Sequence, residues 1–263
     1  MILQDAIEVI RPSVVQFSVK TNIFSKHEQF GSGFIINDDG YIVTCAHVVQ
    51  QAELLKKTGH SVTIGLAYPK IDDPEGITMK YGFYHLDATL LKVDQANDVA
   101  LLKMNPNPFE ISPISAVVII GGDDPVPLYK ECTTSTNRPR DGDSIAVSGY
   151  PLNSPTLITT VGNLASGWAS SDRQVTEDGE NKIVQSDTYL VDISVNPGNS
   201  GGPTYRSEDG RVIGVCTAYQ NAPLMFIDQK GGWAEIDERP VGINSGLCIV
   251  TPIKYVLDLL KSI

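Results

Sequence analysis

The sequence lacks long apolar runs and an excess of basic residues. No stretch reaches the roughly 18 to 20 apolar residues that a membrane helix needs. The first residues, MILQDAIEVIRPS, lack the basic and apolar regions of a secretory signal, so we expect a cytoplasmic protein with no membrane contact. The 263 residues include 20 basic and 31 acidic side chains, a net charge of −11. Because nucleic acids carry charge of the same sign, we expect none as a partner.

Cysteine is also scarce. The four residues are Cys45, Cys132, Cys216 and Cys248, and they form no CxxC pair. This irregular spacing favours buried, reduced thiols over a disulfide framework or a metal site. The chain has neither a P-loop nor an HExxH motif, so we expect no cofactor and no metal ion.

What the sequence does contain is many short runs rich in Val, Ile and Thr, bounded by Gly, Asn, Asp and Pro. Such runs predict strands, and they fall into two sets of about six. The sequence therefore predicts an all-β fold of two six-stranded antiparallel barrels with short N-terminal and C-terminal helices. The expected parts of this single domain, residues 1–263, are a first barrel at 11–104, a linker or insertion at 105–143, a second barrel at 144–250 and a closing helix at 251–263.

Helical spacing of apolar residues predicts the first helix at residues 2–10, ending before Pro12. In the closing helix, Thr251 is the expected N-cap and Pro252 the first helical residue. Three segments are long for loops of a compact domain, and their roles stay open. They are residues 105–143, 170–187 and 219–243.

The motif PGNSGGP, residues 197–203, places Ser200 among glycines and prolines. Such a cluster is typical of a turn, but a serine in it can also be a nucleophile. A serine hydroxyl attacks at neutral pH only with an adjacent base that a third group orients. The chain would have to supply a histidine and a carboxylate elsewhere.

All histidines precede Ser200 in the chain, and they are His27, His47, His60 and His85. The elbow of α/β-hydrolases requires its histidine after the serine, so that interpretation is excluded. The order His, Asp, Ser remains. His47 follows the predicted strand GYIVTCA, and Asp98 opens the run NDVALLKM. Taken alone, His47 could equally be a core histidine and Asp98 a turn cap.

Five motifs occur together and in one order: EVIRPSVVQFSV, GSGFIINDDGYIVTCAHVV, NDVALLKM, GDSIAVSGYPL with TLITTVGNLAS, and DISVNPGNSGGP. In this combination the chain resembles the trypsin-like, chymotrypsin-fold serine proteases, and specifically their HtrA (Deg) branch. The resemblance implies that Ser200 is the nucleophile, His47 the general base and Asp98 the group that orients it. It also implies an oxyanion hole formed by the backbone N–H groups of Gly198 and Ser200.

The resemblance also concerns the substrate. Trypsin carries an acid six residues before its nucleophile, where this chain has Ser194, so cleavage after Lys or Arg is not expected. We expect the substrate to contact Ser194, Val195, Thr217, Ala218 and Tyr219. With Val195 and Ala218 in its wall, the pocket should accept Val, Ala, Ile or Leu.

The expected function is thus a serine endopeptidase that cleaves extended or unfolded polypeptides after small or aliphatic residues. HtrA proteins usually follow the protease domain with one or more PDZ domains, and we expect none here, because the closing helix is followed by no further residues in this sequence. Two alternatives stay open. One is a protease module of a larger signalling or defence system that an activating protein partner switches on. The other is a catalytically silent, peptide-binding scaffold. The oligomeric state also stays open.

Overall fold

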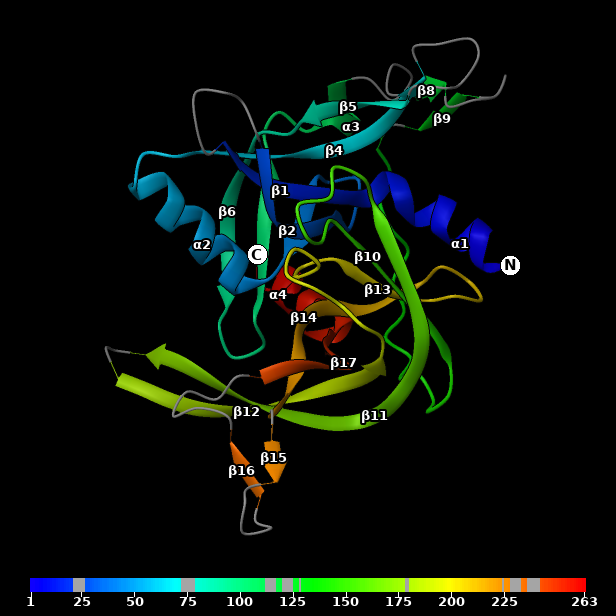
Figure 1. Ribbon diagram of the computed structural model, residues 1–263. Helices are drawn as coiled ribbons and strands as arrows, with labels where there is room; N and C mark the ends of the chain where they lie inside the picture. The colour runs from blue at the N-terminus through cyan, green and yellow to red at the C-terminus, as the bar shows by residue number, and fades with distance from the viewer. Residues whose placement is uncertain are drawn as a thin grey trace.

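The computed structural model describes residues 1–20, 27–71, 79–111, 117–119, 125–127, 129–177, 180–223, 225–227, 233–235 and 242–263. Two antiparallel β bodies make up most of it, one from each half of the chain (Figure 1). The α-helices are α1 (Leu3–Ile10), α2 (Ala46–Lys57), α3 (Pro108–Ile111) and α4 (Ile253–Lys261), and a 3-10 turn, η1, covers Arg11–Ser13. The structure thus confirms an all-β fold with short helices near both ends.

The first body is a seven-stranded sheet in the order β5-β4-β1-β2-β3-β7-β6. Its strands are β1 (Val14–Lys20), β2 (His27–Ile35), β3 (Tyr41–Thr44), β4 (Ser61–Ile71), β5 (Met79–His85), β6 (Ala88–Asp94) and β7 (Val99–Met104). This sheet has seven strands instead of the expected six, because β4 and β5 form a hairpin that adds a strand. The ladder of this hairpin continues one position past β5, where the N–H of Leu86 donates to the carbonyl of Ile64 in β4 at 2.8 Å.

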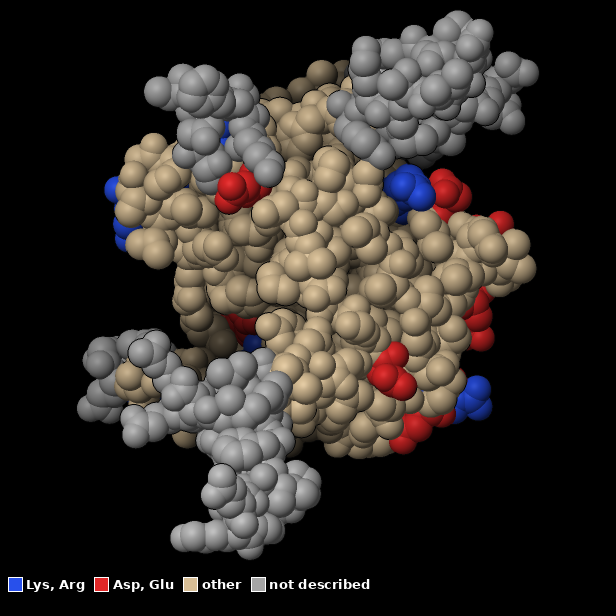
Figure 2. Space-filling view, in the orientation of Figure 1, with Lys and Arg blue, Asp and Glu red and all other residues tan. Residues whose placement is uncertain are grey.

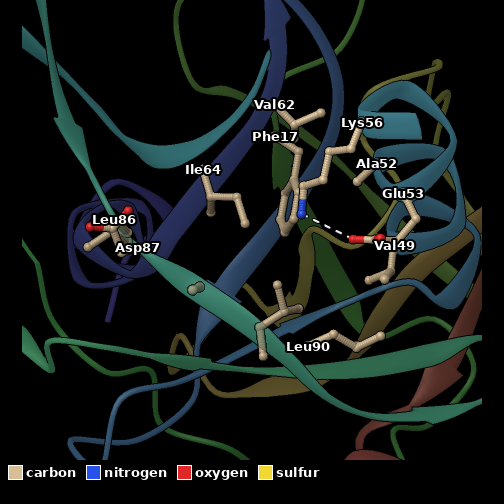
Figure 3. Close-up of a pocket in the computed structure, with 12 residues that line it drawn as sticks. Phe17, Val49, Ala52, Glu53, Lys56, Val62, Ile64, Leu86, Asp87 and Leu90 are labelled. Atoms are coloured by element: carbon tan, nitrogen blue, oxygen red, sulfur yellow. Dashed lines mark hydrogen bonds and ion pairs between the residues drawn. The ribbon is translucent and has the colours of Figure 1, made fainter. Parts of the chain in front are cut away.

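Helix α2 packs against apolar side chains of this sheet. Val49 and Ala52 of α2 face Phe17 of β1 and Ile64 of β4 across a cavity of about 100 Å³ (Figure 3). The Lys56–Glu53 ion pair, with 3.0 Å between Nζ and Oε1, lies on the same helix beside this cavity. Packing of these apolar side chains fixes the start of α2, and with it the side chains that project from its first turn.

The second body is a closed barrel in the order β10-β11-β12-β17-β14-β13, completed where β13 pairs with β10. Its strands are β10 (Ser144–Gly149), β11 (Ile158–Glu177), β12 (Glu180–Asp192), β13 (Pro203–Arg206), β14 (Val212–Pro223) and β17 (Gly242–Pro252). This barrel confirms the expected six strands. Two short hairpins accompany it, one of β8 (Val117–Ile119) with β9 (Pro125–Pro127) and one of β15 (Met225–Ile227) with β16 (Trp233–Glu235).

Strands β11 and β12 continue together beyond the barrel as a two-stranded ribbon, from Ala169 paired with Thr188 to Glu177 paired with Glu180 (Figure 1). The loop expected at residues 170–187 is therefore wrong. Its sequence, SSDRQVTE on the outgoing strand, is polar on both faces and gives little alternation to mark a strand. The segments 105–143 and 219–243 lie partly outside the described residues, and their roles stay open.

The terminal helices connect the two bodies. Helix α1 confirms the helix expected at residues 2–10. Helix α4 packs against β7 of the sheet and β14 of the barrel. Its expected N-cap is wrong: the N-cap is Pro252, and Thr251 is still in β17. Thr251 is instead buried, and its hydroxyl donates to the carbonyl of Asn97 at 2.8 Å, so a barrel strand holds a turn of the sheet.

All four cysteines are buried and free, as the sequence predicts. Cys216 and Cys248 lie on the paired strands β14 and β17, with 3.6 Å between their sulfur atoms. Among the described helices, none has the length and apolar character to cross a membrane. On the face shown in Figure 2, acidic and basic side chains are scattered over the described surface rather than gathered by sign.

Candidate active site between the two β bodies

Three side chains predicted from the sequence meet in one pocket between the sheet and the barrel. His47 comes from α2, Asp98 from the turn between β6 and β7, and Ser200 from the loop before β13. They line a pocket of about 410 Å³. The fold thus brings together side chains that are far apart in the chain, since Asp98 lies 51 positions after His47 and 102 positions before Ser200.

His47 is the second residue of α2, not the end of a strand as the sequence suggested. Strand β3 stops at Thr44, and the helix starts at Ala46. The helix was missed, although Val48, Val49 and Ala52 are spaced to bury one helical face. Its first turn has backbone N–H groups without partners inside the helix, and they lie where an acceptor can use them.

Asp98 supplies that acceptor. Its Oδ1 accepts the backbone N–H of His47 at 3.0 Å, and its Oδ2 lies 2.8 Å from Nδ1 of the same histidine. The carboxylate therefore fixes both the start of α2 and the plane of the imidazole. With the proton on Nδ1, Nε2 keeps its lone pair and faces away from the carboxylate.

The backbone of Asp98 has a φ of 54°, in the left-handed region that few residues other than glycine adopt. Aspartate tolerates this region better than most residues. The turn before it is held by Asp94, whose carboxylate accepts the backbone N–H of Asn97 at 3.0 Å and the side-chain amide at 2.7 Å. A strained residue that is held in place on several sides is typical of a functional site.

The loop around Ser200 depends on two glycines. Gly198 has a φ of 103° and Gly201 a φ of 88°. A Cβ on Gly201 would lie 2.0 Å from the carbonyl oxygen of Ser32, so no other residue fits there. The backbone N–H groups of Gly198 and Ser200 donate to no acceptor within the described residues. Two such free amides are available to an anion.

The hydroxyl of Ser200 donates weakly to the carbonyl of Thr217, at 3.5 Å. Within the described part of the chain it makes no hydrogen bond with His47. Such loose contacts are common in substrate-free sites.

Ser32 of β2 holds this loop from the side of the sheet, and sequence reasoning missed it. Its hydroxyl donates to the carbonyl of Gly198 at 2.6 Å and accepts the N–H of Tyr150 at 2.9 Å. Its backbone N–H donates to the carbonyl of Ser200 at 2.8 Å. The available signal was its place in GSGFII, where a small hydroxyl side chain stands between two glycines. Ser32 thereby connects the first body to the loop that presents Ser200.

Of the residues expected to contact a substrate, Val195, Thr217, Ala218 and Tyr219 line the pocket. Ser194 does not. It is exposed, because Ile193 and Val195 on either side of it are buried and alternation turns it outward. The sequence reasoning also missed Asn196 and Asn221, which add polar groups to the lining.

One cluster in the site has ligand atoms close enough for a metal ion. The candidate atoms of Cys45, His47 and Asp98 lie within 4.8 Å of one another. Burial, followed by the nearby Asp98 charge, raises the pKa of Cys45 well above its usual value, so the thiol stays protonated. The guanidinium of Arg173 already lies 3.0 Å from Oδ2 of Asp98. These residues fit an ion pair with a neutral thiol beside it better than a cation site.

The sequence of this chain matches a known protein family and several of its members. The family model described as "trypsin-like peptidase domain" matches residues 31–215. Serine protease HTRA1A of Danio rerio is 28% identical over 229 residues, which cover 85% of this chain and 38% of that protein. A probable periplasmic serine endoprotease DegP-like of Brucella suis is 31% identical over 188 residues, covering 72% of this chain and 27% of that protein. The chain thus spans well under half the length of these relatives.

Solved structures show the same fold. The active form of the Rv3671c protease from M. tuberculosis has a TM-score of 0.58 at 20% identity, covering 97% of this chain and 82% of that one. The HtrA-type protease AlgW with a tripeptide has a TM-score of 0.56 at 20% identity, covering 100% and 63%. The two β bodies are therefore those of the chymotrypsin-like fold. The chain belongs to the trypsin-like peptidase domain family and is related to the HtrA and DegP serine proteases.

Proposed function

We propose that this protein is a serine endopeptidase that acts through an acyl-enzyme. The observation that carries this proposal is the contact of Asp98 with both the backbone and the ring of His47, in a pocket that Ser200 shares. This is the base and its orienting group in the arrangement that serine nucleophiles require. The kinship with HtrA proteases supports the same chemistry.

The reaction follows from these positions. Ser200 Oγ turns from Thr217 toward His47 and attacks the carbonyl carbon of the scissile bond, while Nε2 takes its proton. The oxyanion of the tetrahedral intermediate accepts hydrogen bonds from the backbone N–H groups of Gly198 and Ser200. His47 then gives its proton to the leaving amine, and the acyl group stays on Ser200. Water, deprotonated by His47, hydrolyses this ester and restores the serine.

The substrate is proposed to be an extended polypeptide. Strand β14 pairs with β13 only as far as Val215, so its edge beside Thr217–Tyr219 has no β13 partner in the described region. An extended chain can add to such an edge by backbone hydrogen bonds. Folded proteins rarely offer a free extended segment, so unfolded chains are the favoured substrates.

The expected cleavage specificity is for small and aliphatic residues, because Val195 and Ala218 line the pocket. Digestion of a library of unstructured peptides should show cleavage after Val, Ala, Ile or Leu. The Ala218→Val substitution adds two methyl groups to the pocket wall and should reduce cleavage after Leu and Ile about tenfold relative to Ala. Mass spectrometry of the products measures both results.

Ala165→Val is the matched control, since Ala165 is exposed on β11 and outside the pocket lining. It should leave the cleavage pattern unchanged. Cleavage after Lys or Arg by the unmodified protein would overturn the proposed pocket.

Ser32 should support the rate without contacting the substrate. Its replacement by Ala removes the hydroxyl that donates to Gly198 and accepts from Tyr150. A lost buried hydrogen bond costs about 1–3 kcal/mol, so we expect kcat to fall roughly 5- to 150-fold with little change in KM. Steady-state kinetics on a cleaved peptide measures this.

The control for Ser32→Ala is Ser18→Ala in β1. It removes an equally buried hydroxyl, which is bonded to Thr63 at 2.7 Å rather than to the serine loop. Ser18→Ala should lower thermal stability without the loss in kcat. Equal losses of kcat in the two variants would mean that Ser32 acts only through overall stability.

A catalytically silent, peptide-binding scaffold is the second candidate. One observation favours it: Ser200 donates to Thr217 rather than to His47. An activating partner that turns this hydroxyl would give the third candidate, a switched protease module. Binding of library peptides without any cleavage would favour the scaffold, and cleavage that begins only when a partner is added would favour the switched module.

A further inference from the structure

Arg173 reaches the candidate active site from the ribbon that extends beyond the barrel. It belongs to β11, where it pairs with Val184 of β12. Its Nη1 lies 3.0 Å from Oδ2 of Asp98, the same oxygen that lies 2.8 Å from Nδ1 of His47. Asp98 therefore has three donors: the N–H and ring of His47 on one side and a guanidinium on the other.

The guanidinium of Arg173 is held by two threonines of the barrel. Its Nη2 donates to Oγ1 of Thr217 at 3.0 Å and to Oγ1 of Thr251 at 3.2 Å. Both hydroxyls give their own protons to backbone carbonyls, Thr217 to Ile249 at 3.1 Å and Thr251 to Asn97 at 2.8 Å. Each hydroxyl is thereby left to accept from Arg173. Both threonine hydroxyls therefore act as hydrogen-bond acceptors for the guanidinium and hold it in place.

The ion pair between Arg173 and Asp98 is largely buried, so its loss would be costly. The side chain of Arg173 is 14% exposed and that of Asp98 10% exposed. A buried carboxylate without a counter-charge is strongly unfavourable, and breaking such a pair costs far more than breaking one on the surface. A neutral His47 cannot supply the missing charge. In the resting site, Arg173 balances Asp98.

We propose that Arg173 is a positioning residue that holds Asp98, and through it His47, in the geometry for proton transfer. This inference rests on the proposed function and deepens it, because it assigns to a residue of the ribbon the role of orienting the catalytic Asp98 and His47. The ribbon residue Ser186 acts on the same turn, since its hydroxyl donates to the carbonyl of Ala96 at 2.6 Å. The ribbon thus grips the Asp98 turn at two points.

Replacement of Arg173 by Met should lower kcat about 10- to 100-fold with KM within about twofold, because displacement of a catalytic group by about 1 Å costs rates of this order. The pH dependence should change as well. Without the guanidinium, the uncompensated carboxylate favours the protonated imidazole more strongly. The acid limb of the kcat/KM profile should therefore move to higher pH by about one unit.

Other titratable groups near this pair do not replace Arg173. Among the described residues, the titratable groups beside this pair include Cys45 and Cys216, in addition to His47. Cys45 is a neutral thiol with a raised pKa and carries no positive charge. Arg173→Lys keeps the charge but has one ammonium for three acceptors, so it should restore the position of the acid limb and only part of kcat.

The matched control is Arg138→Met. Arg138 pairs with Asp187 of the same ribbon, with Nη2 2.9 Å from Oδ2, and it does not touch Asp98. This variant removes an ion pair of the ribbon, while Asp187 keeps Lys254 as a partner, and its pH profile should stay unchanged. If Arg138→Met and Arg173→Met change kcat and the pH profile equally, Arg173 only stabilises the ribbon, and the inference is overturned.

A second readout does not depend on turnover. The ring Nδ1 proton of His47, which lies against Asp98, is followed by proton NMR in the unmodified chain and in both arginine variants. We expect its resonance to shift or broaden in Arg173→Met and to stay in place in Arg138→Met. If the protein cleaved no peptide but showed this NMR pattern, the proposed function would be wrong, whereas the effect of Arg173 on Asp98 and His47 would be supported. If Arg173→Met left the Nδ1 proton resonance, kcat and the acid limb of the pH profile unchanged, the role of Arg173 would be overturned. The proposed protease activity would then still stand.

Discussion

Replacement of Ser200 by Ala is expected to reduce peptide hydrolysis by about 10⁴- to 10⁶-fold. The substitution removes the atom that forms the proposed acyl-enzyme. The loop keeps its shape, because Ser32 still donates to the carbonyls of Gly198 and Ser200 and the N–H of Gly201 still donates to the carbonyl of Cys216. The residual rate would come from the free amides of the loop and from substrate binding. Substrate affinity should be nearly unchanged, which separates lost chemistry from lost structure.

Two measurements test this expectation together. A fluorophosphonate probe should label the unmodified protein on Ser200, identified by peptide mapping, and should not label the Ser200→Ala variant. Ser194→Ala is the matched control, because Ser194 is exposed and does not line the pocket. It should label and cleave like the unmodified protein. A folded protein that takes up no label and cleaves no peptide would contradict the proposed protease activity.

Replacement of Asp98 by Asn is expected to reduce kcat by about 10⁴-fold. An amide that presents its NH₂ group to Nδ1 reverses the hydrogen bond, so the proton moves to Nε2 and the imidazole can no longer act as a base. The same change leaves Arg173 buried without its counter-charge. It also weakens the contact with the first turn of α2, where Oδ1 accepts the N–H of His47.

The control for Asp98→Asn is Asp94→Asn. Asp94 shapes the same turn by accepting from Asn97, but it does not contact His47. We expect Asp94→Asn to cost at most tenfold in kcat. The double variant of Asp98→Asn with Arg173→Met should lose little more than Asp98→Asn alone, because the arginine acts through the carboxylate. If Asp98→Asn retained more than a tenth of the rate, Asp98 would not orient the base.

Local sequence patterns determine the strands and the division into two β bodies. Short runs of β-branched residues predicted the strands, and the two sets of runs predicted two β bodies. The absence of any histidine after Ser200 excludes the α/β-hydrolase fold. These signals are local or depend on order along the chain, so a sequence states them directly.

The start of α2 and the hairpin of β4 with β5 were not predicted, and both alter the first body. The helix follows a strand of only four residues, so the change in period occurs within a few positions. The expectation that Thr251 caps α4 followed a good local pattern but was wrong. In the structure, the carbonyl of Asn97, distant in sequence, takes the hydroxyl proton of Thr251. Tertiary hydrogen bonds overrode the local preference.

By itself, the sequence determined the fold class, the order of His47, Asp98 and Ser200, and the glycines around the serine. Only the tertiary structure decided that Ser32 holds the serine loop and that Arg173 holds Asp98. The reason is physical: each of these contacts joins a polar side chain on a strand to a turn or loop far away in the chain, and the two come together only when the sheet and the barrel meet. A polar strand such as the one that carries Arg173 has no periodicity to reveal where its side chains will point.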